Sequence, residues 1–155
     1  MHKLLLLLFL SFFFLKYTLP AQTIYGLSGS SLVTFEASNP ALILSTTSIT
    51  GISAGQSIAG MDCRPATGEL YAMGYNSTNG EARLYRINPT TGVATAIGAT
   101  ATILQADMGK ISFDFNPTVD RIRVIGSNNA NYRLHPTTGA LVATDGALAF
   151  AAGDA

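Results

Sequence analysis

The sequence predicts an all-β fold built from β-propeller-like, four-stranded antiparallel blades. Three observations support it. A proline-containing turn recurs along the chain, short runs of alternating apolar and polar residues flank each copy, and two kinds of copy alternate. The turns occupy residues 64–68, 88–92, 116–120 and 135–139. Because repetition on this scale identifies repeat architectures, it takes precedence over local signals in predicting the fold.

Each recurring turn has the chemistry of a tight β-hairpin. A four-residue hairpin loop is most often built around a type I turn, and proline at its first position presets φ. The last loop position needs a positive φ, which Gly68, Gly92 and Gly139 adopt without steric cost. Asp120 takes this place in the third copy, and aspartate tolerates the left-handed region. We therefore expect each turn to join two antiparallel strands.

The two kinds of turn combine into blades. Residues 61–74 align without gaps on residues 113–126, and residues 85–92 align on residues 132–139. One hairpin of each kind makes a four-stranded meander of roughly 45–50 residues, the size of a propeller blade.

The predicted domain, residues 22–155, therefore holds two full blades at 57–98 and 110–146. Residues 24–46 predict the second, third and fourth strands of a further blade, whose first strand has no match near the C-terminal end. Propellers typically close with at least four blades. We therefore expect an incomplete propeller, of two full blades plus three N-terminal strands, and expect the sequence to be a piece of a longer protein.

Residues 1–21 predict a signal peptide cleaved near Ala21. Lys3 lies in a short basic start, and residues 4–15 form an apolar run that is too short to span a bilayer. An uncleaved membrane anchor is the alternative. We expect a secreted protein that is extracellular or at the cell surface, with the periplasm as another destination, and no transmembrane span in the mature chain.

Composition excludes some partners. Without residues 1–21 the chain has seven basic and nine acidic residues, a net charge of about −2, and no basic patch, which argues against nucleic acid binding. Cys63 is the only cysteine, so no intrachain disulfide is expected in this sequence. Because Cys63 aligns with Phe115, we favour a small buried hydrophobic residue over a reactive thiol.

The ionisable candidates have both chemical and structural interpretations. Asp62 and Asp114 hold the same place in the two full blades, as an acid/base or cation-binding pair would, but we favour a structural role, accepting backbone N–H groups of the adjoining turn. His135 aligns with Asn88 before a turn proline, and we favour a turn role over a metal ligand or general base.

The arginines offer a possible anion-binding face. Arg121 and Arg123 lie on one face of a predicted strand, and Arg86 and Arg133 recur at matched positions. This face suits anionic glycans, but we favour ordinary surface pairs with acidic residues such as Asp120. The sequence contains no phosphate loop, nucleophile elbow, zinc spacing or calcium loop, so we assign no catalytic, cofactor-binding or metal-ligating residue.

Residues 62–74, 113–124 and 141–154 resemble a bacterial exported family, the domain of unknown function 4394. The resemblance implies a propeller-like fold and an exported bacterial protein, and it transfers no catalytic residue. We expect a non-catalytic binding, display or structural module whose partner is a cell-surface or extracellular protein or a glycan. The alternative is a propeller-type hydrolase or lyase acting on a glycan or lactone, with catalytic residues supplied by blades outside this sequence.

Overall fold

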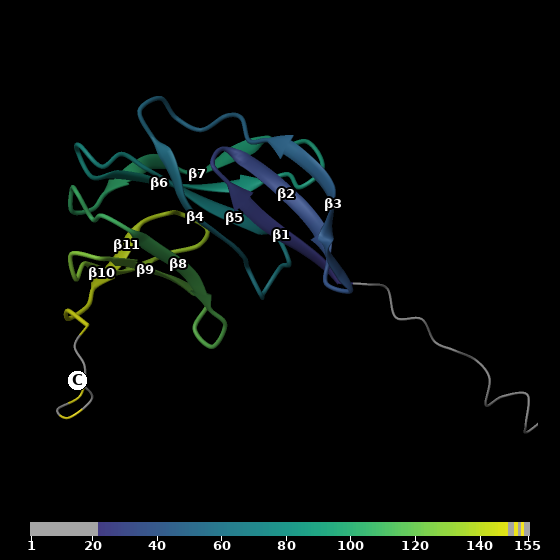
Figure 1. The fold of residues 1–155 in the computed structure, drawn as a ribbon. Coiled ribbons are helices and arrows are strands. Elements are labelled where there is room, and N and C mark those ends of the chain that lie inside the picture. The colour runs from purple at the N-terminus through teal and green to yellow at the C-terminus, as the bar shows by residue number, and fades with distance from the viewer. Residues whose placement is uncertain (1–21, 149–150, 152, 154–155) are drawn as a thin grey trace, which may run out of the picture.

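The computed structural model describes residues 22–148, 151 and 153, and the predicted signal peptide lies outside them. Their regular structure is entirely strand (Figure 1), which confirms the all-β prediction. No helix in this part of the chain is long and apolar enough to cross a membrane. The strands are β1 (Thr23–Ser28), β2 (Ser31–Glu36), β3 (Asn39–Ser48), β4 (Ser57–Cys63), β5 (Leu70–Tyr75), β6 (Glu81–Ile87), β7 (Ala94–Ile103), β8 (Ile111–Asn116), β9 (Arg121–Gly126), β10 (Asn131–Leu134) and β11 (Leu141–Thr144).

The strands form three antiparallel meanders in chain order. β1, β2 and β3 make a three-stranded sheet, β4 to β7 make a four-stranded sheet, and β8 to β11 make another. We call these the first, second and third sheets. Each strand pairs with its neighbour in sequence, because short hairpin loops can connect only antiparallel strands. Figure 1 shows the three sheets following one another across the molecule in sequence order.

The turns have the predicted backbone. Gly68, Gly92 and Gly139 have φ of 70°, 71° and 71°, and Asp120 has φ of 49°. The N–H of Gly68 donates to the carbonyl oxygen of Arg64 at 2.8 Å, and the other two glycines donate in the same way within their own turns. These bonds hold each loop in the geometry that a positive φ at its last position requires.

The second sheet packs against the first sheet on one face and against the third sheet on the other, and the alternating side chains of β5 show this arrangement. Leu70 and Ala72 belong to a core shared with the first sheet. Tyr71 and Met73 point the other way and belong to a core shared with the third sheet. Because successive side chains of a strand point to opposite faces, one apolar strand can serve two cores. All six residues of β5 are buried, so the second sheet is the middle layer of the stack.

Close packing brings the first strands of the second and third sheets together. A Cβ atom placed on Gly60 of β4 would lie 2.5 Å from the Cβ of Phe113 on β8, so glycine permits this approach. Phe115 packs edge-on against Tyr71 with ring centroids 5.2 Å apart. β4 and β8 therefore lie side by side, as the first strands of consecutive blades would. Within the described residues the three sheets do not close a ring.

Cys63 corrects one prediction. We expected it to be buried like Phe115, its counterpart in the alignment, but it is exposed. Phe115 is covered because the second sheet lies in front of it. Cys63 lies on the same side of β4 as Met61, which packs against the core shared with the first sheet. Among the described residues, the first sheet has no strand in the place that β4 holds in the second sheet. The alignment was correct, but the environment of the two positions differs.

Candidate functional site

Asp62 connects two sheets through backbone hydrogen bonds. Its Oδ2 accepts the N–H of Phe115 at 2.8 Å, and its Oδ1 accepts the N–H of Cys63 at 2.7 Å. We expected the Asp62 carboxylate to accept N–H groups of the adjoining turn, but it accepts an N–H group of the neighbouring sheet instead. These two hydrogen bonds are strong for structural bonds, because hydrogen bonds to a charged carboxylate are stronger than those between neutral groups. The structure thus supplies a scaffold explanation for Asp62.

Asp114 holds the same position on β8 and is exposed. Partial burial of its carboxyl group raises its pKa, and the negative charge of Asp62 and a hydrogen bond with it raise the pKa further. The two carboxyl groups therefore lie close together across the β4–β8 contact, and the protonated form of Asp114 is favoured relative to an isolated aspartate. A carboxyl group whose pKa is raised by a neighbouring carboxylate is the type of group that general acids use.

His135 supports a turn. Its Nδ1 accepts the N–H of Thr137 at 3.3 Å and lies 3.1 Å from the hydroxyl oxygen of the same residue. Asn88 does the same in its own turn, where Oδ1 accepts the N–H of Thr90 at 2.9 Å. Asn116 repeats the bond with Thr118 at 3.0 Å. The imidazole nitrogen thus replaces an asparagine oxygen, as the aligned positions predict.

Arg64 replaces asparagine in the first turn and reaches the third sheet. Its Nε donates to Oδ1 of Asp120 at 2.9 Å, and a second guanidinium nitrogen bonds the other carboxylate oxygen. These bonds to Arg64 lower the pKa of Asp120, and the hydrogen bond to Asp120 raises the pKa of Arg64. The pair joins the second and third sheets at their turns, next to the connection that Asp62 makes.

The remaining repeat arginines form surface pairs or bond the backbone. Arg86 donates to Glu69 at 2.9 Å, which lowers the pKa of Glu69. Arg133 and Arg123 share Asp145, with N···O distances of 2.8 Å, and the hydrogen bond from Arg133 is the main reason that the pKa of Asp145 is lowered.

Arg121 lies on the same side of β9 as Arg123, as the sequence predicted, and donates to the carbonyl oxygens of Val119 and Asp120. The arginines thus have acidic or backbone partners, and they do not form a bare cationic face.

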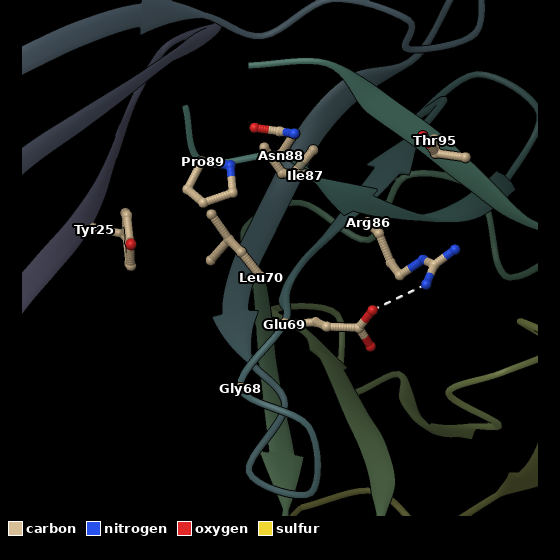
Figure 2. Close-up of a pocket in the computed structure, with 9 residues that line it drawn as sticks. All are labelled: Tyr25, Gly68, Glu69, Leu70, Arg86, Ile87, Asn88, Pro89 and Thr95. Carbon is tan, nitrogen blue, oxygen red and sulfur yellow. Dashed lines mark hydrogen bonds and ion pairs between the residues drawn. The ribbon is translucent and has the colours of Figure 1, made fainter. Parts of the chain in front are cut away.

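One pocket lies between the first and second sheets. It encloses about 270 Å³, and Figure 2 shows Tyr25 of β1 standing across from Leu70 and Pro89, with the Glu69–Arg86 ion pair at one side. Nine residues line it, combining an aromatic ring, aliphatic side chains and hydrogen-bonding groups: Tyr25, Gly68, Glu69, Leu70, Arg86, Ile87, Asn88, Pro89 and Thr95. We call it the β1 pocket.

A second pocket, of about 320 Å³, shares Glu69 and Arg86 with the β1 pocket and reaches Arg64 and Thr137. It lies between the second and third sheets, so the same ion pair borders cavities at two successive sheet interfaces. Sequence reasoning missed both pockets, because each is formed by residues of different sheets. The available signal was the prediction that residues 24–46 form strands of a further blade, which places a strand with Tyr25 beside the second sheet.

Metal chemistry finds no support among the described residues, where no group of three or more histidine, cysteine, aspartate or glutamate side chains converges. Cys63 is exposed, and partial burial of its sulfur together with the charge of Asp62 raises its pKa. A raised pKa reduces the thiolate fraction, the opposite of what a reactive cysteine needs.

Comparison with known proteins confirms the family resemblance. The family model described as "Domain of unknown function (DUF4394)" matches residues 31–155, which is more than half of the chain. No curated protein matches the chain.

Proposed function

The chain belongs to the DUF4394 family, and we propose that it is a non-catalytic binding or display module of an exported protein, with its sheets arranged as blades of an incomplete propeller. One observation carries the proposal. Most polar side chains that the repeat duplicates have structural partners: Asp62 bonds to Phe115 between sheets, His135 bonds to Thr137 within its turn, and Arg86 pairs with Glu69 at the surface. The structural roles of these side chains explain why they recur, without a catalytic role for them.

The β1 pocket supports a glycan as the ligand. Sugars present an apolar ring face together with hydroxyl groups, and this pocket presents the Tyr25 ring together with Glu69, Arg86 and Asn88. The ion pair holds the two charged groups in place, since a guanidinium nitrogen of Arg86 lies 2.9 Å from Oε1 of Glu69. A few well-placed polar groups on an otherwise apolar wall are the general character of small-molecule sites.

A glycan array probed with the exported protein tests this role. We expect binding to a defined set of extracellular glycans, weakened about tenfold by Arg86→Gln or Tyr25→Ala because each removes part of the pocket wall. Arg121→Gln is the matched control, because it removes the same charge outside the pocket. Equal binding by the Arg86→Gln and Arg121→Gln proteins would contradict the pocket assignment.

A second function, a hydrolase or lyase acting on a glycan or lactone, is favoured by one observation. The raised pKa of Asp114 beside Asp62 is the arrangement that acid/base catalysis uses. Chromogenic glycosides and lactones test it directly. Turnover that disappears in Asp114→Asn would support the enzyme and would count against the binding module.

Export is the remaining part of the proposal. The support is the charged start, the apolar run and the small residue Ala21 of the predicted signal peptide. The N-terminal sequence of the protein recovered from a bacterial culture medium or periplasm tests cleavage. We expect it to begin at Gln22, and a recovered protein that retains residues 1–21 would contradict the prediction.

A further inference from the structure

We propose that the edge of β1 opposite β2, which has no partner strand among the described residues, binds an extended polypeptide strand that has the sequence pattern of β4 and β8. The proposal goes beyond glycan binding at the β1 pocket, because it adds a second surface and a different class of partner. β-strand addition to an exposed edge is a common mode of peptide recognition, in which main-chain hydrogen bonds supply affinity and alternate side chains supply specificity.

The chain itself displays the occupied form of this edge twice. β5 lies between β4 and β6, and β9 lies between β8 and β10. β1 takes the place that β5 and β9 have in their sheets, because the sequence predicts it as the second strand of a blade and it too leads by a hairpin to the outer strands. Among the described residues, however, β1 pairs only with β2.

The backbone of β1 offers the hydrogen bonds that a partner strand needs. Ser28 and Ser31 close the β1–β2 hairpin, and the N–H of Ala37 donates to the carbonyl oxygen of Gln22 at its other end. Because hydrogen-bonded and non-hydrogen-bonded residues alternate along an antiparallel pair, Thr23, Tyr25 and Leu27 direct their N–H and C=O groups to the free edge.

Side chains beside this edge identify what the partner must carry. Phe115 of β8 is buried against the second sheet, and Asp62 of β4 accepts its N–H. Cys63 is the counterpart of Phe115 one sheet earlier, yet it is exposed. A strand at the β1 edge that carries the equivalent aspartate would cover the Cys63 thiol. It would also give the Cys63 N–H, which already donates to Oδ1 of Asp62, a second carboxylate acceptor.

The partner is therefore a strand in which a carboxylate lies between two apolar residues and a proline follows two positions after the second. Met61, Asp62 and Cys63 show this pattern before Pro65, and Phe113, Asp114 and Phe115 show it before Pro117. The peptide 110–117 is the probe that best represents it, because its strand has two large aromatic residues on the face that meets a preceding sheet.

The test uses the full chain, expressed from its first residue in an exporting host, and a fluorescent peptide 110–117. We expect saturable binding by fluorescence anisotropy, weakened about tenfold by Thr23→Pro, since proline removes an edge donor without breaking a bond to β2. Thr23→Ala, which keeps that donor, should bind as the wild type does. Asp114→Asn in the peptide should weaken binding, because the bond to the Cys63 N–H loses its charge.

Two measurements on the wild-type protein keep the test decisive if Thr23→Pro fails to fold. Peptide addition should slow amide exchange at Thr23, Tyr25 and Leu27 and should slow modification of the Cys63 thiol. No binding, equal binding to a folded Thr23→Pro protein, or protection of other amides would overturn the proposal. Self-association that Thr23→Pro abolishes, without peptide binding, would overturn it in favour of a second copy. Glycan-array results do not depend on any of these outcomes.

Discussion

At the scale of single residues, the repeated polar groups have identifiable structural partners. Asp62 joins β4 to β8, Arg64 joins the turn after β4 to Asp120, and His135 takes the role of a turn asparagine. Each of these bonds lies within a turn or between sheets. Asp114 differs from Asp62 despite its equivalent position, because the described residues place no further sheet beyond β8.

Asp62 and Asp114 should respond differently to the same substitution. Asp62→Ala leaves two backbone N–H groups without their acceptor, and we expect a loss of about 1–3 kcal/mol in the free energy of unfolding. Asp114→Ala is the matched control and should cause little loss, because it also removes an unfavourable interaction with Asp62. Urea denaturation measures both. Equal losses would show that the two aspartates are not distinguished by their bonds.

His135 should be replaceable by the residue that its position imitates. In His135→Asn the amide oxygen can accept the N–H of Thr137, as Asn88 accepts that of Thr90, so the melting temperature should be unchanged. His135→Ala removes the acceptor and should cost about 0.5–1.5 kcal/mol. Thermal unfolding of the two variants decides between a turn residue and one whose imidazole is needed. A loss of ligand binding in a stable His135→Asn protein would contradict the turn role.

The Arg64–Asp120 pair should make stability depend on acidity. The pKa of Asp120 is lowered in the fold, so its stabilising contribution is present above its usual pKa and is lost as pH falls below about 4. Asp120→Asn should therefore lose less stability than the wild type between neutral pH and pH values below about 4. The pKa of Asp114 is raised in the fold, so protonation of Asp114 favours the folded state as pH falls. Asp114→Asn lacks this contribution and should therefore lose more stability than the wild type on acidification. Unfolding free energies measured across this range test both signs.

At the scale of strands and turns, the local sequence was sufficient to predict the hairpins. The alternation of apolar residues and the proline–glycine turns predicted the hairpins, and the φ values of Gly68, Gly92 and Gly139 agree with that basis. The side-chain contact between β4 and β8, which belong to different sheets, was beyond such reasoning, because it depends on Gly60 allowing Phe113 to approach. The exposure of Cys63 was missed for the same reason, since burial depends on which sheet lies in front of a strand.

Two turn glycines with the same backbone allow a controlled test of this environment. Gly68 and Gly92 have φ of 70° and 71°, but a Cβ on Gly68 would meet open space, whereas one on Gly92 would lie 2.2 Å from the carbonyl oxygen of Ser48. Gly68→Ala should cost about 1–2 kcal/mol from backbone strain alone. Gly92→Ala should cost clearly more, because it also disrupts the contact with β3. Chemical denaturation of both variants is the measurement, and equal costs would contradict the packing around Gly92.

At the scale of the whole molecule, the described residues form a stack of three sheets whose middle layer contributes side chains to a core on each face. Tyr85 and Leu32 in one core and Met73 and Ile122 in the other are among its most deeply buried side chains. Asp62 and the Arg64–Asp120 pair add polar bonds across the second of these interfaces. The repeat therefore duplicates the sheet, whereas the described residues show the polar attachment at only one of the two interfaces.

The attachment of consecutive sheets through Asp62 is the central claim, and amide hydrogen exchange tests it most directly. The N–H of Phe115 donates to Asp62, a residue of another sheet. In Asp62→Ala, compared with the wild type under native conditions, we expect the Phe115 amide to lose protection while amides bonded between β8 and β9 keep theirs. Unchanged protection of Phe115 would contradict the claim that this carboxylate joins the two sheets.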